Sequence, residues 1–191
     1  MLTPRRAAVF AVDIETTGVE DDCALTCVCT WDGELGRTWF FRNPAEFDES
    51  RDEIVDRLEE ARHVLAFGGA RFDLPVLARC FGLGAAALGR WMRKLVDPLY
   101  AAPPLLGLGS GQKLDEFLQR NGMPGKSGSG AHAVELARDG KWDELGSYCL
   151  DDARLTYEAI MARGWWADGV RYDPWCERGV FRLCEEASNA P

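Results

Sequence analysis

An apolar run that ends in two carboxylates is the feature of this sequence that most constrains its fold. Residues 7–12, AAVFAV, have the length and composition of a buried strand, and Asp13-Ile14-Glu15 follows directly. Because side chains alternate along a strand, Asp13 and Glu15 project from the same face. Two buried carboxylates this close repel each other, and a divalent cation is a suitable counter-charge because hard metals bind carboxylate oxygens. We therefore expect further acids to converge here; the alternative is a strand that ends in a solvated acidic turn.

The order of apolar runs along the chain predicts a mixed α/β fold. Runs of apolar and β-compatible residues indicate strands at residues 7–15, 23–31, 37–41, 63–67 and 95–97. Amphipathic periodicity predicts helices at residues 48–62, 73–81, 113–121, 131–138 and 141–163. Short polar turns separate the first three strands, so we expect an antiparallel meander that the later strands extend, with helices packed on the sheet.

Chain length and composition indicate a single domain. The 191 residues, 47% of them hydrophobic, suffice for one core, which we place at about residues 7–162 within the domain 1–191. The tail, 164–191, is rich in tryptophan, and the sequence does not predict its structure. No apolar run approaches the length of a membrane span, and the acids after the first strand interrupt the stretch that a secretion signal would need. A cytoplasmic location is therefore expected.

The seven cysteines are expected to be reduced and structural. They include no C-x-x-C pair, which argues against a zinc cluster, and an odd number without a secretion signal favours a reducing compartment. In the expected second strand, Cys23, Leu25, Cys27 and Cys29 alternate with other residues. This spacing predicts that the four side chains share one face and pack in the core as small apolar groups.

The charge balance limits how this chain could bind nucleic acid. The formal net charge is -9, which argues against a broad basic face that holds a nucleic-acid backbone. It does not exclude nucleic acid as a substrate, because metal ions can bridge acidic side chains to phosphates.

Two later segments supply acids that could join the first pair. Asp73 follows an apolar strand and the turn Gly68-Gly69, where it would begin a helix; alternatively it is an ordinary first-turn acid that the helix dipole stabilises. Tyr148 and Asp152 are four residues apart, so they share one face of a helix, whereas Asp151 is rotated by about 100°. Taken singly, Tyr148 is equally typical of a core tyrosine and Asp152 of a solvated acid.

Together, these three segments resemble the motifs of the DEDD superfamily of 3′–5′ exonucleases, which have a ribonuclease-H-like fold. The first motif, D-x-E, is Asp13-Ile14-Glu15 here; the second is Phe72-Asp73; the third, Y-x-x-x-D, runs from Tyr148 to Asp152. The tyrosine places the resemblance with the DEDDy branch, in particular with polymerase-B-type proofreading exonuclease domains and their stand-alone relatives. The resemblance implies a five-stranded mixed sheet flanked by helices.

The resemblance also implies a two-metal-ion hydrolase with Mg²⁺ or Mn²⁺ as cofactor. The implied metal ligands are Asp13, Glu15, Asp73 and Asp152, and Tyr148 would orient the attacking water. The expected reaction removes nucleoside 5′-monophosphates from the 3′ end of a nucleic acid, with single-stranded DNA as the expected substrate and a polymerase or helicase as a candidate partner. Two other interpretations remain: an RNA exonuclease with the same site, and a catalytically silent module that binds nucleic acid or a polymerase. The tyrosine argues against internal cutting of the ribonuclease H type.

Candidate substrate contacts surround these motifs. Thr16 and Thr17 follow the first acids and Phe72 precedes Asp73, while Lys126 lies in a glycine-rich loop that could contact a phosphate or merely connect two helices. That loop is not a P-loop, because Arg120 stands where a Walker A motif needs glycine. Relatives often carry asparagine about five residues before the second-motif aspartate. Gly68 occupies that position here, which puts fine substrate handling in doubt.

Two further features allow a functional and a structural interpretation. The segment Arg90-Trp91-Met92-Arg93-Lys94 combines cations with an aromatic ring, so it would either contact a nucleic-acid strand or pack Trp91 into the core. His63 and His132 both lie far from Asp152 in the sequence, which excludes the histidine branch of the superfamily. We expect His132 to be a structural or loop residue.

Overall fold

A five-stranded mixed sheet forms the centre of the molecule. The structure is a computed structural model, and it describes residues 9–101, 113–126, 128–163, 165–167 and 170–172. The strands are β1 (Val9–Thr16), β2 (Leu25–Trp31), β3 (Gly36–Phe40), β4 (His63–Leu65) and β5 (Leu95–Val96), in the order β3-β2-β1-β4-β5. β1, β2 and β3 pair antiparallel, whereas β4 and β5 extend the sheet in parallel. The predicted meander, the five strands and the fold class are confirmed.

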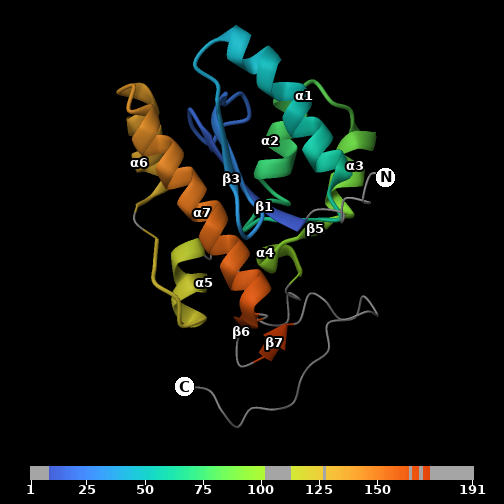
Figure 1. Ribbon diagram of the computed structural model, residues 1–191, viewed down its shortest axis with the longest axis vertical. Helices are drawn as coiled ribbons and strands as arrows, with labels where there is room; N and C mark the ends of the chain where they lie inside the picture. Colours follow the sequence, from blue (N-terminus) through green and yellow to red (C-terminus); the bar gives the residue numbers. More distant parts are fainter. Residues whose placement is uncertain (1–8, 102–112, 127, 164, 168–169, 173–191) are drawn as a thin grey trace.

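Helices cover both faces of the sheet (Figure 1), and the sheet separates two hydrophobic cores. On one face lie α1 (Pro44–Glu60), α2 (Asp73–Cys80) and α3 (Ala85–Met92); on the other lie α5 (Leu114–Arg120), α6 (Gly130–Arg138) and α7 (Trp142–Arg163). The short helix α4 (Pro98–Ala101) follows β5. Among the described helices, none combines the length and the hydrophobicity needed to cross a bilayer.

The predicted helices are confirmed, and the structure adds elements that the sequence did not predict. α1 begins at Pro44, earlier than expected, because the Asn43 side chain accepts a hydrogen bond from the Glu46 N–H and caps the helix. Two short helices, α3 and α4, were not predicted, because eight and four residues are too few to show a clear helical period. In the tail, the structure adds a hairpin of β6 (Trp165–Ala167) and β7 (Val170–Tyr172), while residues 173–191 lie outside the described part.

A β-bulge corrects the predicted arrangement of the cysteines. Glu15 pairs with Cys27, but Thr16 pairs with Leu25, so β2 has one extra residue between the two pairs. An extra residue reverses the alternation of side chains beyond it. Cys27 therefore packs under α7, whereas Leu25 packs on the α2 side of the sheet. The prediction that Cys23, Leu25, Cys27 and Cys29 share one face was wrong for the first two.

Helix α7 lies close to the sheet because it has a glycine at the contact. A Cβ atom on Gly146 would lie 2.7 Å from Phe40 Cζ and 3.3 Å from Thr38 Cγ2, which is closer than carbon atoms pack. Because α7 also carries Tyr148 and Asp152, this contact determines how near both side chains come to β1.

We predict that Gly146→Leu destabilises the fold. The larger side chain would push α7 away from β3, and overpacking of this kind costs about 1–3 kcal/mol. Urea unfolding of both proteins measures the difference in the free energy of unfolding. The neighbouring exposed residue provides a matched control, because Ser147→Leu meets no packed surface and should change stability by no more than about 0.5 kcal/mol. Equal effects of the two substitutions would contradict the close approach.

Candidate functional site

The structure brings the four predicted acids together where β1 ends. Asp13 and Glu15 lie near the end of strand β1. Asp73 is the first residue of α2, and Asp152 lies in the middle of α7. The carboxylates are close enough that Glu15, Asp152 and Asp73 each add to the pKa of Asp13, after the larger effect of burial. Three separate segments thus converge on one acidic site, as the two-residue spacing in β1 predicts.

Burial makes this cluster electrostatically unfavourable without a cation. It raises the pKa of Glu15 to about 8, with a further contribution from Asp152, and the pKa of Asp73 to about 7. For Asp73, backbone N–H groups of Asp73 and Ile14 act in the opposite direction and hold the carboxylate against β1. Asp13 is only partly buried as a residue, but its Oδ2 atom is buried and accepts no hydrogen bond from the described part of the chain. An unpaired buried carboxylate oxygen is a free ligand atom for a metal ion.

Lys126 provides a positive charge inside the site. Its Nζ atom lies 2.6 Å from Asp152 Oδ2 and 4.9 Å from the centre of the Tyr148 ring. Burial raises the pKa of Asp152, and the Lys126 ammonium opposes that rise. From the sequence, we expected that Lys126 could contact a phosphate. The structure gives it a carboxylate of the acid cluster, a partner that no local spacing in the sequence could reveal.

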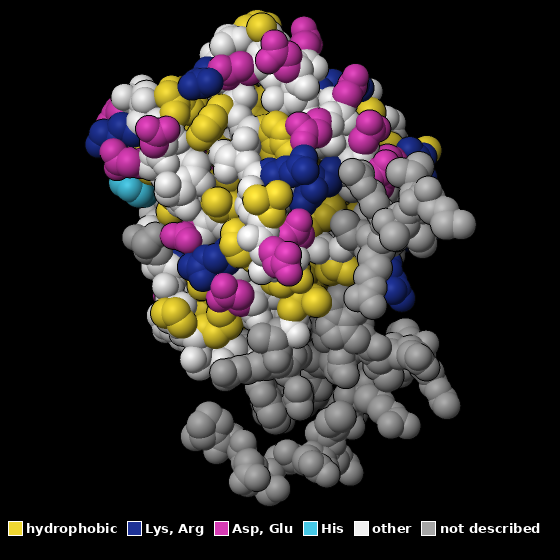
Figure 2. All heavy atoms as spheres, viewed as in Figure 1, with side chains coloured by type: hydrophobic (Ala, Val, Ile, Leu, Met, Phe, Trp, Pro, Cys, Tyr) yellow, Lys and Arg dark blue, Asp and Glu magenta, His cyan; other side chains and the backbone are white. Residues whose placement is uncertain are grey.

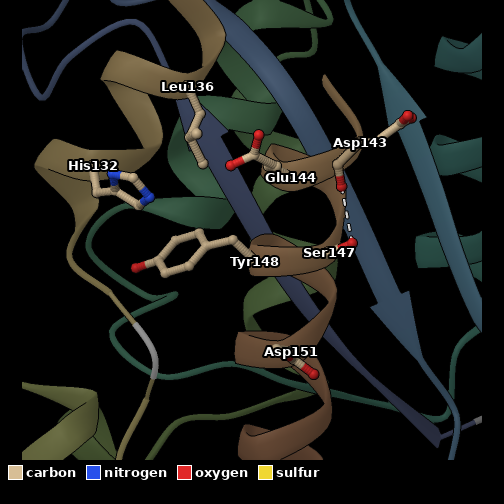
Figure 3. Close-up of a pocket in the computed structure, with 7 residues that line it drawn as sticks. All are labelled: His132, Leu136, Asp143, Glu144, Ser147, Tyr148 and Asp151. Carbon is tan, nitrogen blue, oxygen red and sulfur yellow. Dashed lines mark hydrogen bonds between the residues drawn. The ribbon is translucent and has the colours of Figure 1, made fainter. Parts of the chain in front are cut away.

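Tyr148 lies one helical turn before Asp152, and its ring is covered by the loop that carries Lys126. Gly128 approaches so closely that a Cβ atom there would lie 3.0 Å from the ring. Figure 3 shows the ring extending from α7 toward His132, at the edge of a pocket of about 390 Å³. The phenol oxygen is buried and makes no hydrogen bond of ordinary geometry within the described residues, but it lies near the Lys126 ammonium and the Asp152 carboxylate. The phenol is thus part of the acid site.

An open groove of about 750 Å³ continues from Lys126. Its walls combine apolar and polar side chains, among them Phe67, Leu99, Lys113, Lys126 and Ser129. The groove and the acid site share Lys126, so a flexible ligand in the groove would have one end beside Asp152.

Asp97 supports the turn that carries Asp73 and was missed by sequence analysis. The residue is 2% exposed, and its carboxylate accepts hydrogen bonds from the N–H groups of Gly68, Ala70 and Leu99, at 3.0, 2.9 and 3.0 Å. Gly68 has φ +79°, a conformation that favours glycine, so this turn is held by Asp97 and not by an asparagine side chain. A usable signal was present: Asp97 directly follows a short parallel strand, where ligand-binding and supporting polar residues gather.

The other predicted substrate-contact residues, Thr16, Thr17 and Phe72, all have contacts within the protein. The Thr16 hydroxyl donates a hydrogen bond to the Gly18 carbonyl at 2.5 Å, and the Thr17 hydroxyl accepts one from the Ala24 N–H at 3.0 Å. Both side chains therefore stabilise the turn after β1. Phe72 is half-buried and packs against the core on the α2 side. Their roles toward a substrate stay predictions.

The basic segment around Trp91 serves the fold. Trp91 is fully buried, and its indole N–H donates to Glu59 at 3.1 Å. Arg90 pairs with the same carboxylate at 2.8 Å, and Lys94 donates to the Leu58 carbonyl at 3.3 Å. A nucleic acid could not stack on a tryptophan in this position, so the packing interpretation is correct.

We predict that the metal-free protein loses stability as the pH rises. Because the folded-state pKa values of Glu15 and Asp73, about 8 and about 7, exceed the ordinary values of 4.5 and 3.8, the folded state binds protons that the unfolded chain has lost. Their stabilising contribution is complete below about pH 4 and is lost by about pH 8. Melting temperatures measured with a chelator should therefore fall between about pH 5 and about pH 8. Mn²⁺ should restore the loss, and Glu15→Gln should flatten the slope; an unchanged slope in that variant would contradict the assignment.

Comparison with known proteins agrees with this architecture. A family profile described as RNase H superfamily matches residues 10–161. The family B DNA polymerase from the hyperthermophilic archaeon Pyrobaculum calidifontis has a similar structure, with a TM-score of 0.60 and 17% sequence identity over 85% of this chain and 25% of that chain. This chain thus corresponds to about a quarter of that polymerase, and at this identity the likeness concerns the fold alone. No curated protein sequence matches. The profile covers most of the chain, and the chain therefore belongs to the RNase H superfamily, whose members are typically metal-dependent phosphodiester hydrolases.

Proposed function

We propose that this protein is a divalent-metal-dependent 3′–5′ exonuclease that acts on single-stranded DNA. One observation carries the proposal: four carboxylates from β1, α2 and α7 converge beside the buried phenol of Tyr148. Acids from several elements around one site are what metal-assisted phosphodiester hydrolysis requires. The proposed products are nucleoside 5′-monophosphates, and RNA is the alternative substrate.

The donor set fits Mg²⁺ or Mn²⁺. Asp13, Glu15, Asp73 and Asp152 offer oxygen ligands only, which hard divalent cations prefer. Each of the four has a raised pKa, which shows that its charged form is unfavourable in the site. A bound cation would stabilise these charges by offsetting their repulsion. When bound, such ions lower the pKa of the attacking water and offset the charge that develops on the leaving oxygen.

The other residues of the site position the reactants. Burial raises the pKa of Tyr148 well above its ordinary value, so the phenol stays protonated and would orient the attacking water by a hydrogen bond instead of removing its proton. The Lys126 ammonium, now paired with Asp152, would turn toward the scissile phosphate when metal ions take over that carboxylate. Asp97 would keep Asp73 in place through the turn at Gly68.

The surface favours a short, single-stranded end as substrate. In Figure 2, Lys and Arg side chains form separate groups among Asp and Glu side chains on the face shown. With a net charge of -9, the protein would gain little affinity from a long backbone. The groove beside Lys126 is large enough for a terminal nucleotide, and its half-buried Phe67 offers an apolar surface to a base.

We predict shortening of a 5′-labelled single strand from its 3′ end in the presence of Mg²⁺ or Mn²⁺. DNA and RNA strands are tested in parallel, and a ladder on denaturing gels distinguishes end removal from internal cutting. Asp152→Asn removes a metal ligand and should lower the rate by at least about 100-fold. Asp151→Asn is the matched control, because the Asp151 side chain is half-exposed and pairs with Arg154 at 3.2 Å. If neither polymer is shortened, or if both variants match the parent, the proposed function is wrong.

We also predict that Lys126→Ala has opposite effects on catalysis and on metal binding. Loss of the ammonium should lower kcat by about 10- to 100-fold, because an electrostatic contact to the phosphate is lost. The same change should strengthen Mn²⁺ binding, because a positive charge leaves the acid cluster. Lys141→Ala is the control, since Lys141 is exposed and lines neither the groove nor the pocket beside Tyr148. An unchanged kcat, or weaker Mn²⁺ binding, would argue against this role.

A further inference from the structure

Three thiols lie directly beneath the carboxylate site, and the proposed hydrolysis uses none of them. Cys27 and Cys29 project from β2, and Cys149 projects from α7, one residue after Tyr148. All three are fully buried, and their sulfur atoms lie within 4.8 Å of one another. The Sγ atoms of Cys27 and Cys29 are 3.7 Å apart. We call these three residues the thiol cluster.

Strand register places the thiol cluster next to the acids. Cys27 is the cross-strand neighbour of Glu15, and Cys29 is the neighbour of Asp13, so the four side chains share the face under α7. Cys149 completes the link, because its Sγ lies 3.4 Å from the Asp13 carbonyl oxygen. The ligand atoms of Asp13, Glu15 and Cys149 also lie within 4.8 Å of one another. Oxygen and sulfur donors thus form one continuous set that runs from the acid site into the core.

The two halves of this donor set prefer different cations. Carboxylates suit Mg²⁺ and Mn²⁺, whereas thiolates select thiophilic ions such as Zn²⁺. With Zn–S bonds of about 2.3 Å, two sulfurs of a tetrahedral site lie about 3.8 Å apart, close to the separation of Cys27 and Cys29. Two thiolates neutralise the charge of a buried divalent ion. The third sulfur and Glu15 can complete its set of four ligands. Each thiol that binds releases its proton to the buffer.

We propose that the thiol cluster is a binding site for a thiophilic divalent cation, Zn²⁺ or Cd²⁺, reached through the acid site. Such an ion binds Cys27, Cys29 and Cys149 and draws Glu15 away from the ions of the acid site. Thiophilic cations therefore inhibit the protein while Mg²⁺ does not. Binding to the cluster is independent of any nuclease activity; only the inhibition rests on the proposed function.

The binding test uses Cd²⁺, whose bonds to thiolates give an ultraviolet charge-transfer band. The full chain is reduced, kept in excess Mg²⁺ and titrated, with Cys176 and Cys184 replaced by serine in every protein. We expect a band that saturates at about one equivalent and an affinity that falls at least about 10-fold in Cys27→Ala and in Cys149→Ala. Cys80→Ala is the control and should bind as the parent does, because Cys80 lies on the other side of the sheet.

The outcomes separate a metal site from ordinary core packing. If the thiols only pack, Cys27→Ala lowers the melting temperature but the parent gives no charge-transfer band, and the proposal is overturned. A band of equal strength in the parent and in both cluster variants also overturns it. If one cluster variant does not fold, the other decides.

A second measurement tests the inhibition. Zn²⁺ added at one equivalent in excess Mg²⁺ should stop shortening of the labelled strand by the parent, and Cys27→Ala should need at least about 10-fold more Zn²⁺. Equal sensitivity of both proteins would overturn the inhibitory role. If the protein has no nuclease activity at all, the Cd²⁺ titration still decides whether the thiol site exists, so the two proposals fail separately.

Discussion

Repulsion among buried carboxylates is the constraint on which the rest of this structure depends. Asp13, Glu15, Asp73 and Asp152 come from three elements, and each would be more stable in water than beside the others. The fold holds them by packing that has no part in the chemistry: α7 rests on β3 through Gly146, and Asp97 holds the turn before α2. Stability built in the two cores is thus used to maintain a site that is unfavourable by itself.

Much of this arrangement could be predicted from local patterns. The strand that ends in Asp13 and Glu15 fixes its side-chain directions by alternation, and the four-residue spacing of Tyr148 and Asp152 fixes theirs on a helix. The antiparallel meander followed by parallel strands also follows from short turns and alternating helices. In each of these cases the relevant interactions lie within a few residues along the chain.

What could not be predicted depends on contacts between distant segments. The pairing of Lys126 with Asp152 joins residues 26 positions apart, and the burial of Trp91 depends on α1, which supplies Glu59. The bulge between Cys27 and Leu25 leaves the residue types of β2 unchanged yet reverses the side on which they pack. A spacing rule assumes unbroken alternation, so it placed Cys23 and Leu25 on the wrong face.

The ion pair of Lys126 bears on the order in which this protein acquires its parts. Without any cation, the charges of the acid cluster would oppose its formation unless the carboxylates took up protons. The ammonium of Lys126 is part of the chain, and it pairs with Asp152 without any ion from solution. The chain can therefore fold without metal, and an ion that binds Asp152 under the proposed function would displace the lysine. Under the proposed function, metal supply would then determine when the protein is active, but not whether it folds.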